Sequence, residues 1–154
     1  MKRVPSRLLL LLPVVVLTAC GGGDRNAKAA YVEQATIVCE QARSDIAALS
    51  QPTMATGFGP FVGQSVAIAA KAQQDLAALT PPEPDRAELE SKVLDPFAAF
   101  VVDGKAFAER VNAAAADQIA LLALLSERPT PDDVDLDYLR AYGLAACADA
   151  IDPT

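Results

Sequence analysis

Cysteine has the widest chemical range of any residue type in this chain, and the sequence contains three: Cys20, Cys39 and Cys147. A thiolate can act as a nucleophile, hold a soft metal ion or form a disulfide. The chain contains no histidine, which removes the Cys-His and Ser-His pairs of nucleophilic catalysis and histidine metal ligands. Cys39 and Cys147 have no basic neighbour and no CxxC arrangement, so a structural role is favoured over a reactive thiol or metal pair.

Carboxylates form the second chemical candidate, in the stretch that contains Asp132, Asp133, Asp135 and Asp137. Hard oxygen ligands of this kind could hold calcium, but the glycine and the final bidentate glutamate of an EF-hand loop are missing. A solvated helix start, where the helix dipole favours negative charge, is the favoured interpretation. The sequence leaves open whether Asp132–Asp137 binds a cation, and it predicts no metal site and no cofactor.

Two aromatic residues could contact other molecules. Phe58 lies among glycines in "MATGFGPFVG", where it could form a partner-contact surface or fold back over the end of a helical bundle. The phenol of Tyr142 in "RAYGL" could bind a ligand, or its hydroxyl could be satisfied by backbone or water. The chain contains no G-x-S-x-G, Walker or Rossmann motif, so we expect a protein that is not an enzyme.

The first residues carry an export signal. Positive charge at Lys2, Arg3 and Arg7 precedes an apolar segment from Leu8 to Leu17, which is too short to span a membrane as a helix. The following "LTAC" resembles the lipobox of bacterial lipoproteins, in which the cysteine sulfur receives a diacylglycerol and becomes the mature N-terminus. The resemblance implies a signal peptide at 1–19, a lipidated Cys20 with a flexible tether over 20–27, and a protein anchored to the outer face of the cell membrane. A simple secretory signal is the alternative.

The charge balance excludes one class of partner. Loss of residues 1–19 removes three of the 13 Lys and Arg and none of the 20 Asp and Glu, which leaves ten against 20 and a formal charge of −10. This balance argues against nucleic acid and against anionic lipid bound by charge.

The remaining chain, 28–154, is expected to form one all-α domain, because alanine is abundant and apolar residues recur at three- and four-residue spacing. Helices are predicted over 28–49, over 61–79 and from Asp85, with a kink or a short opening turn at Pro96. A further break is expected near Asp117, a plausible N-cap, and the last helix is expected to begin after Thr130. Short connections predict an antiparallel four-helix bundle, with a possible fifth short helix.

A disulfide between Cys39 and Cys147 is the economical interpretation, because these are the cysteines left after Cys20 in a compartment where thiols oxidise. The lipobox, the first-helix "AYVEQATIVCEQARSDIAAL", the middle "LAALTPPEP" and the terminal "LRAYGLAAC" are similar to small alanine-rich exported proteins and lipoproteins of actinobacteria. The resemblance implies the same pairing and a helical fold, and it adds no activity.

The sequence favours two functions. The first is a lipid-anchored envelope protein that acts by binding or scaffolding, with the membrane and an envelope protein as partners. The alternative is a carrier that holds a small apolar ligand or lipid between its helices. A cavity lined by Phe97, Phe100 and Phe107 would favour the carrier, whereas a filled core with an exposed apolar patch would favour contact.

Overall fold

The computed structural model describes residues 23–152, and the predicted all-α fold is confirmed over them. The elements are α1 (Gly23–Ala47), α2 (Ala55–Ala78), α3 (Arg86–Leu89), the π-helical segment η1 (Glu90–Leu94), α4 (Asp95–Ala113), α5 (Gln118–Ser126), α6 (Leu136–Tyr142) and α7 (Ala145–Ile151). No strand occurs among these residues. None of the described helices is long and apolar enough to cross a membrane.

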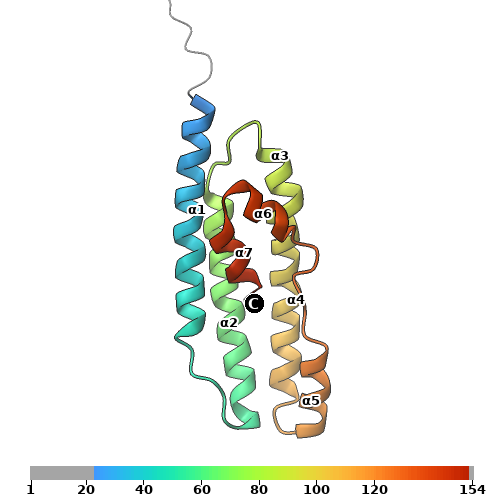
Figure 1. The fold of residues 1–154 in the computed structure, drawn as a ribbon. Helices are drawn as coiled ribbons and strands as arrows, with labels where there is room; N and C mark the ends of the chain where they lie inside the picture. Colours follow the sequence, from blue (N-terminus) through green and yellow to red (C-terminus); the bar gives the residue numbers. More distant parts are fainter. Residues whose placement is uncertain (1–22, 153–154) are drawn as a thin grey trace, which may run out of the picture.

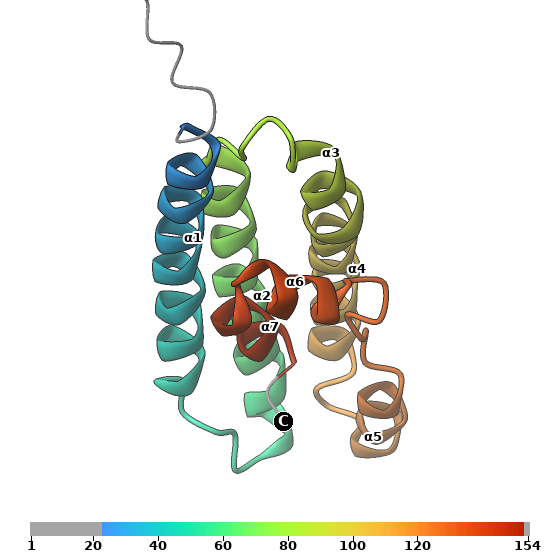
Figure 2. The same ribbon diagram turned by 45° about the horizontal axis from the view of Figure 1, so that its top comes forward.

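Three long rods form a layer. α1, α2 and the continuous rod α3–η1–α4 lie side by side, and α5 folds back beside the lower end of α4 (Figure 1). The C-terminal helices α6 and α7 pack in front of this layer, with α7 against α1 and α6 against η1 (Figure 2). The predicted helical bundle is therefore present, and its fourth position is occupied by two short helices.

The fourth position is filled for only part of its length. At 1.5 Å per residue, the 25 residues of α1 extend about 37 Å, whereas the seven residues of α7 extend about 10 Å. Gly143, with φ of 108°, separates α6 from α7 in a conformation that glycine adopts without the steric cost of a Cβ atom. The lower part of the three-helix layer is consequently left uncovered by α7.

Pro96 follows a short opening segment, α3 with η1, as predicted, and no non-helical residue separates this segment from α4. The proline lies in the first turn of α4. In the π-helical segment before it, the Asp95 amide donates a hydrogen bond to the Glu90 carbonyl. In an α-helix the amide of residue 96 would donate to the carbonyl of Lys92, and proline has no such amide. That carbonyl instead accepts the backbone N–H of Asp135 at 3.0 Å. Because Pro96 has no amide, the Lys92 carbonyl is free to accept the bond that attaches the loop before α6 to the rod.

Several predicted boundaries are wrong. α1 begins at Gly23, so residues 23–27 are helical and do not form part of a tether. α2 begins at Ala55 rather than at the predicted residue 61, and it includes Gly57, Gly59 and Pro60. The reason is packing: a Cβ atom at Gly59 would overlap the Asn112 side chain of α4, so this glycine permits close approach of the two helices.

The last helix also begins later than predicted. Thr130 does not cap it, because the Thr130 hydroxyl donates to the Asp132 carboxylate at 2.6 Å. The cap is Asp135, whose carboxylate accepts the Tyr138 amide at 2.8 Å. The predicted break at Asp117 is confirmed, since its carboxylate accepts the amides of the first turn of α5.

The core has two parts. The larger cluster joins α1, α2, the third rod, α6 and α7, and the predicted disulfide between Cys39 and Cys147 is present within it, with 4.9 Å between the Cα atoms. The smaller cluster, formed by Phe107, Val111 and Leu121, lies at the other end between α4 and α5. Both clusters and the disulfide lie within residues 23–152, so this domain contains its own core.

Candidate functional site

An apolar groove lies where the three-helix layer is uncovered below α7. Its volume is about 260 Å³. Four helices provide its walls, through the side chains of Cys39, Ala42, Ile46, Ser65, Val66, Ala69, Ala72, Leu76, Phe97, Phe100, Cys147, Ala150 and Ile151. We call this set the apolar groove.

Alanine accounts for the space in the groove. Ala42, Ala69, Ala72 and Ala150 line it, and each contributes only a methyl group where a larger side chain would extend across the gap. The polar side chain in the wall is that of Ser65, and its hydroxyl donates to the Phe61 carbonyl at 3.0 Å. The groove walls therefore contain no charged side chain and leave no free serine donor.

The disulfide belongs to the groove wall. Cys39 and Cys147 are 4% and 2% exposed and connect α1 directly to α7. Of the three phenylalanines named as cavity residues from the sequence, Phe97 and Phe100 line the groove, and their rings stack 6.4 Å apart between centroids. Phe107 lies in the smaller core cluster instead.

The Tyr142 side chain connects α6 to α1 and to the residue before α3. Its hydroxyl donates to the Asp85 carboxylate at 2.7 Å, its ring meets that of Tyr31 edge-on at 6.3 Å between centroids, and the Lys28 ammonium lies 3.8 Å from its ring centroid. Burial, and after it the hydrogen bond to Asp85, raises the pKa of the Tyr142 phenol above its ordinary value. The hydroxyl is thus satisfied by a carboxylate rather than by backbone or water.

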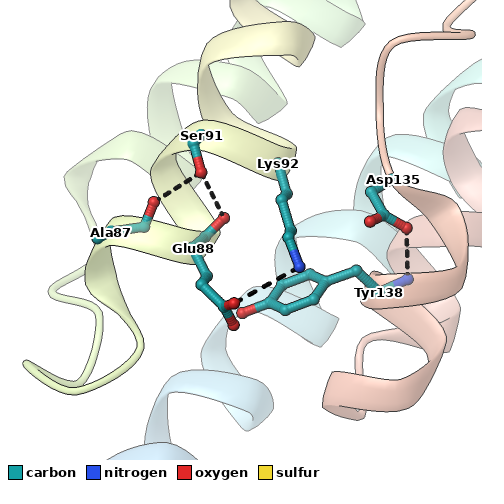
Figure 3. A network of polar contacts seen from close by, with 6 residues as sticks. All are labelled: Ala87, Glu88, Ser91, Lys92, Asp135 and Tyr138. Atoms are coloured by element: carbon teal, nitrogen blue, oxygen red, sulfur yellow. Dashed lines mark hydrogen bonds and ion pairs between the residues drawn. The ribbon is translucent and has the colours of Figure 1, made fainter.

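A second set of contacts joins the third rod to α6 (Figure 3). The Lys92 ammonium lies 3.6 Å from the Glu88 carboxylate and 4.6 Å from the centroid of the Tyr138 ring. Ser91 donates to the carbonyl of Ala87 at 2.8 Å. Of these three contacts, the one between Lys92 and Tyr138 crosses from the rod to α6, and a partly exposed contact of this kind contributes at most about 1 kcal/mol.

A wide acidic cleft lies beside α6. Its walls include five aspartates, namely Asp132, Asp133, Asp135, Asp137 and Asp152, and two arginines, Arg128 and Arg140. We call this the acidic cleft; its volume is about 890 Å³. Within the described residues, no three acidic or cysteine side chains converge as a metal site requires.

Phe58 is not on a free loop. It lies in the first turns of α2, is half-buried and packs against the smaller core cluster. The large apolar side chains that are most exposed nearby are those of Met54 before α2 and of Ile119 and Leu122 on α5, at 69%, 83% and 63%. Ile119 and Leu122 are three residues apart and therefore lie on one face of α5. Cys20 lies outside the described residues.

The sequence did not indicate that the side chains of the apolar groove line one space. Ile46, Val66 and Ile151 lie on three different helices, and no spacing within one helix indicates that they share a wall. The available signal was the alanine content of the inward faces, which predicts close packing as readily as it predicts a gap. No family model, curated protein or solved structure matches this chain.

Proposed function

We propose that this chain is an exported, lipid-anchored envelope protein that binds a small apolar ligand in the apolar groove and catalyses no reaction. The groove is the observation that supports this function most directly, because it combines a volume of about 260 Å³ with walls that contain no charged side chain. Pockets for small ligands are typically concave and mostly apolar, as this one is.

The volume limits the ligand to one short chain or one small ring system. At roughly 30 Å³ for a group the size of a water molecule, the groove holds about eight methylene groups. Burial of eight methylenes at about 0.8 kcal/mol each would contribute about 6 kcal/mol. The cost of immobilising the ligand reduces this sum, so a Kd on the order of tens of micromolar is the tightest expected. We therefore expect weak, reversible binding suited to a carrier.

The anchor is proposed from the sequence, and the start of α1 determines how far it could reach. Cys20 precedes Gly23, where α1 begins, by three positions, a span of at most about 11 Å. Such a link would hold the N-terminal end of α1 against the membrane. The groove residues of α1 begin at Cys39, about 24 Å farther along the helix.

Ligand binding is tested by filling the groove. Ala69→Leu adds a side chain that extends into the space, whereas Ala77→Leu makes the same change at an exposed position of the same helix. Titration calorimetry of residues 23–154 with 1-octanol should give saturable binding that Ala69→Leu abolishes and Ala77→Leu preserves. Equal binding by both variants would place the ligand elsewhere, and the absence of binding in the parent protein would end the proposal.

The anchor is tested by Cys20→Ala. The variant should be released from the membrane fraction or remain unprocessed, because it lacks the sulfur that would carry lipid. A variant that is still cleaved before position 20 and still bound to membranes would contradict lipidation.

Contact with an envelope protein is the second candidate, and the exposed apolar face of α5 favours it. Ile119 and Leu122 leave a helix surface without a partner in the described residues. Ile119→Ser with Leu122→Ser should weaken crosslinking to an envelope protein, and Phe58→Ser tests the alternative surface. Because Phe58 packs against the smaller core cluster, its variant requires a parallel measurement of unfolding.

A further inference from the structure

The apolar groove and the acidic cleft adjoin. Phe100 and Ile151 line both, so these two side chains lie between the two spaces. A molecule that lies in the groove and reaches past them would enter the cleft. The ligand that fits both spaces has an apolar part and a polar part.

The charge of the acidic cleft determines which polar group of a ligand it would attract. Five aspartates face two arginines, an excess of three negative charges. Arg140 is further engaged, with its guanidinium 3.5 Å from Asp137 and 3.9 Å from Asp149. The side chains of Asp133 and Asp152, both exposed, have no hydrogen-bond or ion-pair partner among the described residues. A cationic group would be attracted here, and an anionic one would be repelled.

From these two observations we infer that the ligand is a small single-chain amphiphile with a cationic amine head group. The alkyl chain occupies the apolar groove, and the ammonium lies in the acidic cleft near Asp133 and Asp152. This inference rests on the proposed function, because the groove supplies the binding and the cleft supplies the preference for charge. Fatty acids and anionic lipids are disfavoured by the same argument, since their head group would lie in the cleft, where five aspartates outnumber Arg128 and Arg140.

The test compares three probes with the same eight-carbon chain: octylammonium, 1-octanol and octanoate. Residues 23–154, with the disulfide intact, are titrated by calorimetry with each probe at low and high salt. An exposed ion pair contributes up to about fivefold in affinity. We expect octylammonium to bind about fivefold more tightly than octanol, octanoate to bind less tightly than octanol, and the differences to shrink as salt screens the charges.

Two variants of equal charge change identify the source of the preference. Asp133→Asn with Asp152→Asn should bring octylammonium to the affinity of octanol and leave octanol binding unchanged. Asp103→Asn with Glu109→Gln removes two exposed charges outside both spaces and should preserve the preference. Circular dichroism checks that each variant is folded.

The outcomes separate the two claims. If octanol binds and Ala69→Leu abolishes its binding, while the three probes have equal affinity or octanoate binds best, the charge inference is overturned and groove binding stands. If no probe binds, both claims are overturned. If the control pair of substitutions removes the preference as completely as the cleft pair, the overall charge of the domain accounts for it and the cleft does not.

Discussion

Removal of the Cys39–Cys147 disulfide should lower the free energy of unfolding by about 5 kcal/mol. The bond joins residues 108 positions apart, and the entropy that a cross-link removes from the unfolded chain grows with the logarithm of this separation. For 108 residues the chain-entropy relation gives about 16 cal/mol/K, or about 5 kcal/mol at 25 °C. A domain of this size has a total stability of about 5–15 kcal/mol, so the cross-link accounts for a large share of it.

The assay is urea unfolding of residues 23–154, followed by far-ultraviolet circular dichroism, with and without Cys39→Ala and Cys147→Ala together. The midpoint should fall, and the dependence on urea should steepen because the unfolded chain without its cross-link exposes more surface. The melting temperature should fall by roughly 15–20 °C. The parent protein treated with a thiol reductant provides the control, because it loses the same bond and keeps both side chains.

The entropic reasoning would be refuted if the double variant lost less than about 2 kcal/mol with an unchanged dependence on urea. That result would mean that α7 stays near α1 in the unfolded chain even without the bond. A loss in the alanine variant that clearly exceeded the loss on reduction would instead assign the difference to the packing of the two buried sulfurs.

Three further predictions follow from individual contacts. Gly143→Ala should lower the free energy of unfolding, measured by urea titration, by about 1–2 kcal/mol, because φ is positive at this position. The added Cβ atom would contact Val32 at an ordinary distance, so no clash adds to this loss. Asp117→Ala should lower the free energy of unfolding by about 1 kcal/mol or less in the same titration, because two amides in the first turn of α5 lose their acceptor. The helical signal of α5 should fall as well. The folded state raises the pKa of Tyr142 above its ordinary value of 10.0, so this group stabilises the protein below pH 10 and the contribution is lost as pH rises through the folded pKa. Unfolding free energies measured from pH 8 to 11 should therefore fall above pH 10, and Tyr142→Phe should reduce that slope.

Local signals in the sequence predicted the parts of the fold that depend on local chemistry. The cap at Asp117 was predictable because a carboxylate before an apolar run can accept the free amides of a first helical turn. The disulfide was predictable from two cysteines in a chain whose first residues predict export. The helical class followed from the spacing of apolar residues. Each of these inferences needs only neighbouring residues or a count.

Long-range packing determined what the sequence did not predict. Gly59 reads as a helix breaker, yet it allows α2 to approach α4, and nothing near it in the sequence identifies Asn112 as its neighbour. Thr130 is a plausible cap by type, but the backbone of Asp135 is attached to Lys92 of another helix, and the last helix begins there. The groove was beyond prediction for the same reason, because it depends on how far α7 extends over three other helices.

The hydrogen bond between the Asp135 amide and the Lys92 carbonyl has a consequence for motion. Backbone amides in exposed loops normally exchange with solvent through small local openings, whereas this amide can exchange only when the loop detaches from the rod. Asp135 should therefore be a slowly exchanging position within a fast-exchanging segment. Pro96 has no backbone N–H that could compete for the Lys92 carbonyl, and the bond joins two main-chain atoms, so it does not itself require a particular side chain at either end. The acidic residues around it can change identity over evolutionary time while the backbone that presents them stays in register with the third rod.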